Sequence, residues 1–296
     1  MYKLSGRLDM DILKYKVTDK NREDLSWFEH REIDDTVSAK ELRSHTRENT
    51  KKISELQDKL FAEGKVAVLI IFQAMDAAGK DGAIKHVMSG VNPQGVNVHS
   101  FKAPSVEELS HDYLWRAVKV LPARGKIAIF NRSYYEDVLI VKVHKLYENY
   151  NTPDRMKTPD TIEKRYRQIR DFEDYLWENG IITVKFFLHL SKKEQRKRFL
   201  KRIDRKDKNW KFSQADLKER QSWDAYQEAY KTAIYETATD KNPWFVVPAD
   251  KKAYTRAVIS EVLLDVMSRI DPNYPEVSEQ QEADLIECKK RLDEEA

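Results

Sequence analysis

The stretch Val66-Ala-Val-Leu-Ile-Ile-Phe-Gln-Ala-Met-Asp-Ala-Ala-Gly-Lys-Asp-Gly82 decides the fold of this chain. Six of its first seven residues are strongly apolar, which predicts a buried strand. A turn of small residues follows and ends in Gly79-Lys80, and a helical pattern begins at about Asp81. The backbone N–H groups of such a turn, the positive end of the helix and a lysine ammonium all attract anions. The stretch therefore predicts a strand, a phosphate-binding turn and a helix.

This turn departs from the Walker A pattern G-x-x-x-x-G-K-[ST] at two positions. Ala74 stands in place of the first glycine, and Asp81 stands in place of the Ser/Thr whose hydroxyl holds Mg²⁺. A further acid, Asp76, lies inside the turn itself. A carboxylate inside a phosphate-binding turn indicates a metal ion that is held from an unusual side.

The composition predicts a soluble protein of the cytoplasm. A length of 296 residues suffices for one large α/β domain with appendages or for two small domains. The net charge is only +3, so an anion site must come from local clustering of cations. The single Cys288 excludes an intrachain disulfide and fits a reducing compartment. No signal-peptide pattern and no apolar run near the roughly 18 residues of a membrane span are found, so we expect no membrane partner.

Short apolar runs alternate with helical patterns along the chain, which predicts an α/β fold with a five-stranded parallel sheet flanked by helices. The predicted strands are 66–72, 96–101, 126–130, 181–188 and 244–247. The predicted helices are about 39–61, 80–90, 106–120, 158–179, 192–203, 214–239 and 251–270. We expect an N-terminal helical extension, a central phosphate-loop domain and an acidic tail that is an exposed helix or a frayed end, over 1–62, 63–272 and 273–296 respectively. The helix 39–61 carries few apolar residues, so a narrow packing face is expected, and it and the tail are either subunit contacts or solvated appendages.

A second candidate site is Asn131-Arg-Ser-Tyr-Tyr-Glu-Asp137, directly after the strand 126–130. Ligands in parallel sheets sit at the carboxyl ends of the strands, so this segment should meet the phosphate turn. Arg132 would direct its donors at a phosphate, and Glu136 and Asp137 would supply metal or acceptor contacts. A surface i,i+4 pair of Arg132 with Glu136 is the structural alternative. Lys102, after the strand 96–101, could reach the same cleft.

The segment 191–211 carries eleven Lys/Arg against three Asp/Glu. Such a basic helix and loop after a late strand resembles the lid of phosphoryl-transfer kinases, which closes over phosphates and excludes water. A solvated helix face is the alternative, and nucleic acid is another polyanion that would balance the charge. The segment lacks the alternation of basic and aromatic residues that favours base stacking, so nucleic acid is the weaker expectation. Tyr226 and Tyr230, at helical spacing, favour packing over base binding.

With these residues in hand, about 25–270 of the chain resembles the polyphosphate kinase 2 family. The resemblance rests on the joint presence of several spaced motifs, and any one of them alone would be weak. The motifs are Asp76-Ala-Ala-Gly-Lys-Asp-Gly82, Phe101-Lys-Ala-Pro-Ser105, Asn131-Arg-Ser-Tyr-Tyr-Glu-Asp137, the pattern Arg198-Phe…Arg202…Asp204…Trp210-Lys-Phe-Ser213…Asp216, and Pro243-Trp-Phe-Val-Val-Pro-Ala-Asp250.

The resemblance implies a P-loop kinase fold close to thymidylate kinase, with a basic helical lid at about 191–213. It also implies inorganic polyphosphate and nucleotides as substrates, Mg²⁺ as cofactor with Mn²⁺ as a substitute, and a homo-oligomer (dimer or tetramer). The expected catalytic residues are Asp76, Lys80, Arg132 and Glu136. The expected phosphate- and nucleotide-binding residues are Ala77, Ala78, Gly79, Lys80, Asp81, Gly82, Lys102, Asn131 and Arg132, and the expected lid cations on polyphosphate are Arg198, Lys201, Arg202, Arg205, Lys206 and Lys208.

Members of this family divide by acceptor. Those that use ADP generally carry Asp-Arg-Ser where this chain has Asn131-Arg-Ser133, and Asn in place of Glu136. The form found here resembles the subgroup that phosphorylates both AMP and ADP, and GMP and GDP are further candidates. Because an amide is a poorer Mg²⁺ ligand than a carboxylate, the metal is expected on Asp76 with Glu136 or Asp137.

Two other functions are compatible with parts of the sequence. An ATP-dependent nucleoside monophosphate kinase would share the fold, but such kinases usually keep the glycine and the Ser/Thr of the turn. A non-catalytic module that binds polyphosphate or RNA would keep the basic lid but needs neither Asp76 nor Glu136.

Overall fold

The computed structural model of the chain describes residues 8, 10–29 and 33–295, so the predicted N-terminal extension lies partly outside the described residues. At its centre is a sheet with the strand order β1-β6-β5-β2-β4-β3. Five strands run parallel, and β1 pairs with β6 in the antiparallel sense. The strands are β1 (Lys16–Val17), β2 (Ala67–Ala74), β3 (Val96–Ser100), β4 (Ile127–Asn131), β5 (Ile181–His189) and β6 (Trp244–Pro248).

The five predicted strands are all present, and the parallel sheet is confirmed. Strands β2 and β4 are neighbours in the middle of the sheet, and Phe72 lies opposite Asn131. The two predicted sites therefore meet where the carboxyl ends of these strands lie side by side. The sixth strand, β1, is absent from the sequence prediction because two residues are too few to show an alternation of apolar and polar side chains.

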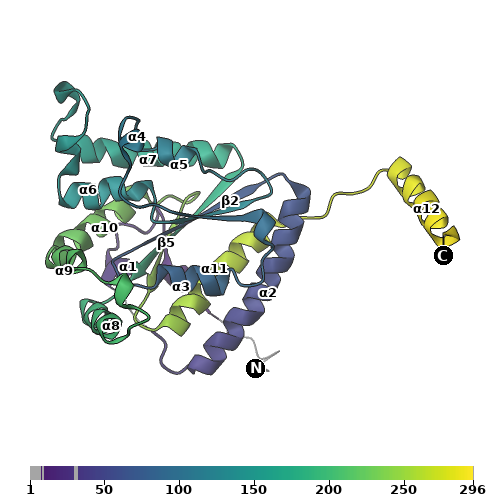
Figure 1. Cartoon of the computed structure of the whole chain (residues 1–296), viewed down its shortest axis with the longest axis horizontal. Coiled ribbons are helices and arrows are strands. Elements are labelled where there is room, and N and C mark those ends of the chain that lie inside the picture. The colour runs from purple at the N-terminus through teal and green to yellow at the C-terminus, as the bar shows by residue number, and fades with distance from the viewer. Residues whose placement is uncertain (1–7, 9, 30–32, 296) are drawn as a thin grey trace.

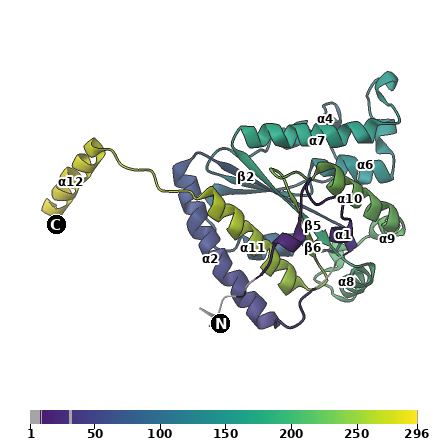
Figure 2. The same ribbon diagram turned by 180° about the vertical axis from the view of Figure 1, so that it is seen from behind.

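Helices cover both faces of the sheet (Figures 1 and 2). Alternate residues of β2 enter two separate cores, with Val68 and Ile70 on one face and Leu69 and Ile71 on the other. This alternation follows from the two-residue period of a strand. The first face packs against α2 (Ala39–Glu63), α3 (Lys80–Val87) and α11 (Lys252–Ile270), and the second against η3 (Tyr134–Val138), α6 (Ile140–Val143), α7 (Thr161–Glu178) and α10 (Trp223–Thr237).

Helix α2 begins after Ser38, its N-cap residue. The Ser38 side chain accepts a hydrogen bond from the N–H of Glu41, and Gly64 ends the helix with a φ of 66°. Its packing face is wider than the sparse apolar pattern predicts, because polar side chains are buried against α11 as well. Asn49 donates to Ser260 Oγ at 3.2 Å and to Glu261 Oε2 at 2.7 Å.

Two predicted helices are wrong in their extent. The segment 106–120 forms two short helices, α4 (Val106–Leu109) and α5 (Trp115–Val118), and the segment 214–239 forms α9 (Gln214–Gln221) and α10. Local side-chain bonds end α4: the Ser110 hydroxyl donates to the carbonyl of Glu107, and Asp112 accepts from the N–H of Leu114. Such bonds compete with helix continuation, and a periodicity of apolar residues does not reveal them.

The acidic tail forms the exposed helix α12 (Glu279–Glu294), which extends away from the sheet (Figure 1). None of the described helices is long and apolar enough to cross a bilayer. The lid segment contains α8 (Lys192–Asp204) and η6 (Asn209–Lys211). The remaining short elements are η1 (Leu13–Tyr15), α1 (Ser26–Glu29), η2 (Pro93–Gly95), η4 (Leu146–Asn149) and η5 (Asp154–Met156).

Candidate active site

The phosphate loop, residues 75–79, connects β2 to α3 as the sequence predicts. Ala77 and Gly79 adopt positive φ angles of 63° and 104°. Positive φ costs a residue with a Cβ more than it costs glycine, and such backbone strain concentrates at functional sites. The ammonium of Lys80, the first residue of α3, lies 3.1 Å from the carbonyl oxygen of Ala74, so it folds back over the loop.

The buried Arg198 of helix α8 hydrogen-bonds the carbonyl groups of the phosphate loop. Its Nη1 donates to the carbonyls of Ala77 and Ala78 at 3.0 and 2.8 Å, and its Nε donates to Glu194 Oε1 at 2.9 Å. Its Nη2 donates to the carbonyls of Ala249 and Asp250, after β6, at 2.6 and 3.0 Å. The five donors of the guanidinium are thus all taken up by the protein. This arrangement differs from the predicted role of Arg198 on polyphosphate, because no donor is left for a substrate.

Gln195, one turn before Arg198, completes this attachment by donating to the carbonyl of Asp76 at 3.0 Å. Three successive carbonyls of the loop are therefore tied to α8. The C=O and N–H of one trans peptide point in opposite directions, so the N–H groups of Ala77 and Gly79 face away from α8. Donors that point out of a tight loop form an anion-binding concavity.

On the substrate side of the loop, four charged groups lie together. Arg132 donates to Asp76 Oδ1 at 2.9 Å. Burial, together with the nearby Arg132, lowers the pKa of Lys80 to about 8, although Asp76 and Glu136 oppose the shift. The sequence expectation that β2 and β4 bring these residues to one place is therefore confirmed in geometry. The surface pairing of Arg132 with Glu136, the structural alternative, does not describe this half-buried cluster.

Glu136 lies in this cluster, whereas Asp137 does not. The amide nitrogen of Gln73, oriented by its neighbours, lies 2.9 Å from Glu136 Oε1. Burial raises the pKa of Glu136, and the charges of Arg132 and Lys80 oppose that shift. Asp137 instead accepts from Arg165 at 3.3 Å and from the Tyr150 hydroxyl at 3.1 Å. Burial raises the pKa of Asp137 to about 6.

Asp81 and Asn131 contact each other beside the loop. Asn131 Nδ2 donates to Asp81 Oδ1 at 3.0 Å, and Lys211 of the lid segment donates to Asp81 Oδ2 at 3.1 Å. Although burial works against it, these two bonds hold the pKa of Asp81 below its usual range. The sequence gives no signal that Lys211 of the lid segment contacts Asp81, because the two residues are 130 positions apart.

The predicted lid cations fall into different environments. Arg202 bonds the carbonyl of Lys211 at 3.2 Å, and its charge reaches Asp216, whose pKa is raised by burial and by Asp76. Arg205 forms a bidentate pair with Asp207 at 3.0 and 2.8 Å. The residues Lys201 and Lys206 are exposed, Lys208 lies 4.0 Å from Asp207, and Lys102 is exposed on the far side of β4, where its carbonyl accepts from Arg116.

The oxygen ligands here fit Mg²⁺. Mg²⁺ keeps several waters and is usually held by one or two carboxylates together with substrate phosphates. Asp76 and Glu136 are two carboxylates beside the phosphate loop, and each acts on the Lys80 charge. In the described part of the chain there is no cluster of three or more His, Cys, Asp or Glu that would bind a metal without a substrate. The donor set therefore suits a metal shared between protein and phosphate.

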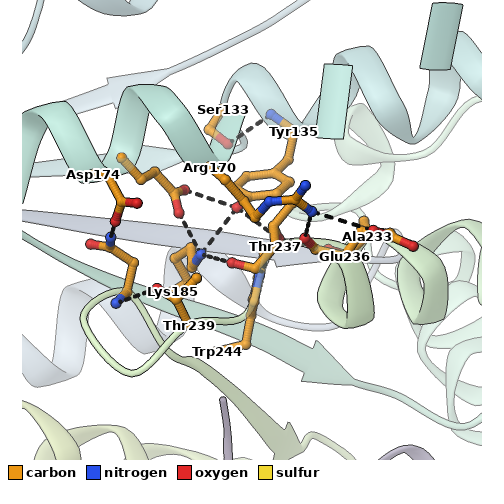
Figure 3. A network of polar contacts seen from close by, with 12 residues as sticks. Ser133, Tyr135, Arg170, Asp174, Lys185, Ala233, Glu236, Thr237, Thr239 and Trp244 are labelled. Carbon is orange, nitrogen blue, oxygen red and sulfur yellow. Dashed lines mark hydrogen bonds and ion pairs between the residues drawn. The ribbon is translucent and has the colours of Figure 1, made fainter. Parts of the chain in front are cut away.

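A buried polar network holds the segment after Arg132 in place (Figure 3). Lys185 of β5 donates to Glu173 of α7, to the Tyr135 hydroxyl at 3.1 Å and to the carbonyl of Thr237 at 2.9 Å. Tyr134 and Tyr135 both donate to Glu173 Oε1, at 2.9 and 2.8 Å. Two adjacent tyrosines anchored in this way fix the backbone between Arg132 and Glu136. Arg132 itself has a φ of 65°, a strained conformation that needs such support.

Tyr226 and Tyr230 of α10 pack into the core, as their spacing predicts. Tyr230 stacks on Phe187 with ring centroids 4.4 Å apart. Burial raises the pKa of both hydroxyls, the hydrogen bond to Glu219 adds to it for Tyr226, and the charge of Glu136 acts on both, so these buried rings lie next to the charged cluster. The sequence gives no sign that these tyrosines lie next to the charged cluster, since tyrosines of the core and tyrosines beside a site share the same helical period.

A parallel sheet in this order, with a lysine-bearing loop between its central strand and a helix and with a basic lid, defines a P-loop phosphotransferase. The family model described as Polyphosphate kinase 2 (PPK2) matches residues 36–275. The chain belongs to this family and is an enzyme of the polyphosphate:nucleotide phosphotransferase class.

Two named relatives and a solved structure agree with this assignment. The chain is 51% identical over 248 residues to a Rhodopseudomonas palustris protein named ADP-polyphosphate phosphotransferase, covering 83% of this chain and 86% of that protein. It is 42% identical over 279 residues to a Meiothermus ruber protein named AMP/ADP-polyphosphate phosphotransferase, covering 93% and 99%. The crystal structure of polyphosphate kinase 2 from Arthrobacter aurescens TC1 superposes with a TM-score of 0.78 at 41% identity, covering 85% of this chain and 88% of that one.

Proposed function

We propose that the chain transfers a phosphoryl group reversibly between inorganic polyphosphate and adenine nucleotides, with AMP and ADP both as acceptors and GMP and GDP as further candidates. The observation that carries the proposal is the cluster of Lys80, Arg132, Asp76 and Glu136 at the phosphate loop. The names of two relatives support the acceptor range, one naming ADP and the other AMP and ADP. The presence of Asn131 and Glu136 supports AMP in addition to ADP.

The reaction needs no general base. A terminal phosphate oxygen of the acceptor, already ionised at neutral pH, forms a bond to the end phosphorus of the donor. The bond between that phosphorus and its bridging oxygen breaks, and the shortened polyphosphate leaves with the electron pair. The obstacle is bringing two polyanions together, so catalysis consists of positioning and charge neutralisation.

Each residue of the cluster has a part in that neutralisation. Lys80 and the N–H groups of the loop hold the transferred phosphoryl group, and Arg132 spans donor and acceptor. Arg202 and Lys211 close from the lid, where Lys211 already contacts Asp81. Asp76 and Glu136 would hold Mg²⁺. When bound, the ion neutralises charge on the phosphate oxygens.

The test is an acceptor panel. Purified protein is given long-chain polyphosphate and Mg²⁺ with AMP, ADP, GMP or GDP in separate reactions, and ATP plus AMP serves as the donor control. We expect ADP and ATP from AMP, ATP from ADP, and faster turnover with polyphosphate than with ATP as donor. Absence of ADP and ATP in the AMP reaction would remove AMP from the acceptor range. Absence of product with every acceptor would refute the proposed function.

A further inference from the structure

A group of cations lies on the α11 side of the phosphate loop, outside the cluster described above. Lys252 and Arg256 border a small concavity whose other walls are Ala78, Gly79, Ala83 and Thr255. Arg256 also lies against the first turn of α3, since a Cβ placed on Gly82 would be 3.3 Å from its Nη2. Lys201 of α8 completes the group, because its charge acts on Lys252. We call Lys201, Lys252 and Arg256 the outer cation cluster.

The outer cation cluster has no acidic partner within residues 8, 10–29 and 33–295, where none of its three side chains takes part in an ion pair or hydrogen bond. Glu194 is the acid whose charge reaches Lys252, and it is already bonded to Arg198 at 2.9 Å. Burial lowers the pKa of Lys252 and of Arg256, and neighbouring cations lower that of Lys252 further. Cations that lie together without an acidic partner repel one another, and the binding of an anion relieves that repulsion.

The two flanks of the phosphate loop therefore differ in chemistry. The flank toward β4 and α10 carries the acids Asp76 and Glu136. Those carboxylates suit a metal ion that bridges to the phosphate of a nucleotide acceptor. The flank toward α11 presents the cations of the cluster. It suits a ligand that consists of phosphate alone.

We propose that the outer cation cluster binds the donor polyphosphate beyond the phosphoryl group that is transferred. The cluster would thereby direct the rest of the polyphosphate across α11. The proposal rests on the proposed function, because it assigns one side of the phosphate loop to the donor and the other to the acceptor. Only donors long enough to reach from the loop to the cluster gain from this contact. The cluster therefore makes the enzyme favour long polyphosphate over short oligophosphates.

The experiment compares charge reversal in the cluster with charge reversal elsewhere. The double variant Lys252→Glu/Arg256→Glu is measured beside the control Lys51→Glu/Lys52→Glu. Lys51 and Lys52 are exposed lysines of α2, outside the cluster, and their reversal changes the net charge by the same amount. For the cluster variant we expect the KM for long-chain polyphosphate to rise about tenfold or more, as expected for two lost charge-assisted contacts. The KM for the nucleotide should stay within about twofold, and activity with tripolyphosphate should fall much less than with the long chain. The control should match wild type with every substrate.

Equilibrium binding of long-chain polyphosphate, measured by calorimetry without nucleotide, separates this proposal from the proposed function. Each lost phosphate contact should lower the slope of log Kd against log salt by roughly 0.7, so the double variant should differ from wild type by roughly 1.4. Lys252→Gln/Arg256→Gln, which avoids new repulsion, should show an intermediate loss if the reversal variant fails to fold. Wild-type binding and KM in the neutral variant would overturn the proposal, as would a raised nucleotide KM or an equal loss on long and short donors. If the wild type binds polyphosphate but does not turn it over, and the double variant loses that binding, the cluster is supported and the proposed function is refuted.

Discussion

Replacing Arg198 tests whether α8 shapes the phosphate loop or supplies a cation to substrate. Arg198→Met removes all five donors and leaves four carbonyls, two in the loop and two after β6, without their partner. Breaking a buried charged network of this kind costs about 3–5 kcal/mol in the free energy of unfolding. Arg198→Lys keeps the charge but has one point of attachment, so it cannot bridge the loop and the segment after β6. We expect the unfolding free energy to fall in Arg198→Lys by about half as much as in Arg198→Met.

The effect on turnover follows from geometry. A loop displaced by about 1 Å costs about 10²-fold in rate, so kcat should fall by that factor in Arg198→Lys, with the KM for polyphosphate nearly unchanged. Arg196→Met, at an exposed arginine on the same helix, is the matched control and should behave as wild type. The assays are steady-state kinetics with polyphosphate and nucleotide varied separately, and urea unfolding. A raised KM for polyphosphate with normal kcat and stability would refute this account and return Arg198 to a substrate-binding role.

Three further changes test other parts of the site. Lys185→Met leaves Glu173 buried without its cation, so the unfolding free energy should fall by about 3–5 kcal/mol. Adding Glu173→Gln to this variant should restore part of the lost stability. Equal stability of Lys185→Met and of the double variant in thermal unfolding would contradict the pairing. Because the pKa of Lys80 is lowered to about 8 and the charged form binds phosphate, kcat/KM for polyphosphate should fall as the pH rises above 8, and a profile flat to pH 10 would contradict this assignment. Gly79→Ala, at a φ of 104°, should lose about 1–3 kcal/mol of stability and much of the activity, whereas Gly90→Ala, at 94° with open space around it, should lose stability alone.

The sequence was sufficient for the parts of the fold that depend on local patterns. The strand before Gly79-Lys80 and the five parallel strands follow from short stretches of chain. The site could be placed because β2 and β4 end in polar motifs, and parallel neighbours bring their carboxyl ends together.

What the sequence could not give depends on distant partners. Arg198 is one of eleven basic residues in the segment 191–211. Nothing in that segment shows that its guanidinium donates to the distant carbonyls of Ala77 and Ala249. The choice between Glu136 and Asp137 depends on which side of the η3 turn faces Lys80, and Tyr150 and Arg165 take up Asp137 from later elements. The break at Ser110 likewise depends on local side-chain bonds rather than on the period of apolar residues.

The phosphate loop is the centre of this account, and two substitutions test it most directly. Lys80→Ala removes the ammonium that holds the transferred group, and Asp76→Asn removes the carboxylate beside Arg132 while keeping its shape. With long-chain polyphosphate, Mg²⁺ and ADP, each variant should form ATP at least about 10²–10³ times more slowly than wild type, because each removes transition-state charge stabilisation. Circular dichroism should show that both remain folded. Near-normal ATP formation by either folded variant would contradict the assignment of phosphoryl transfer to this loop.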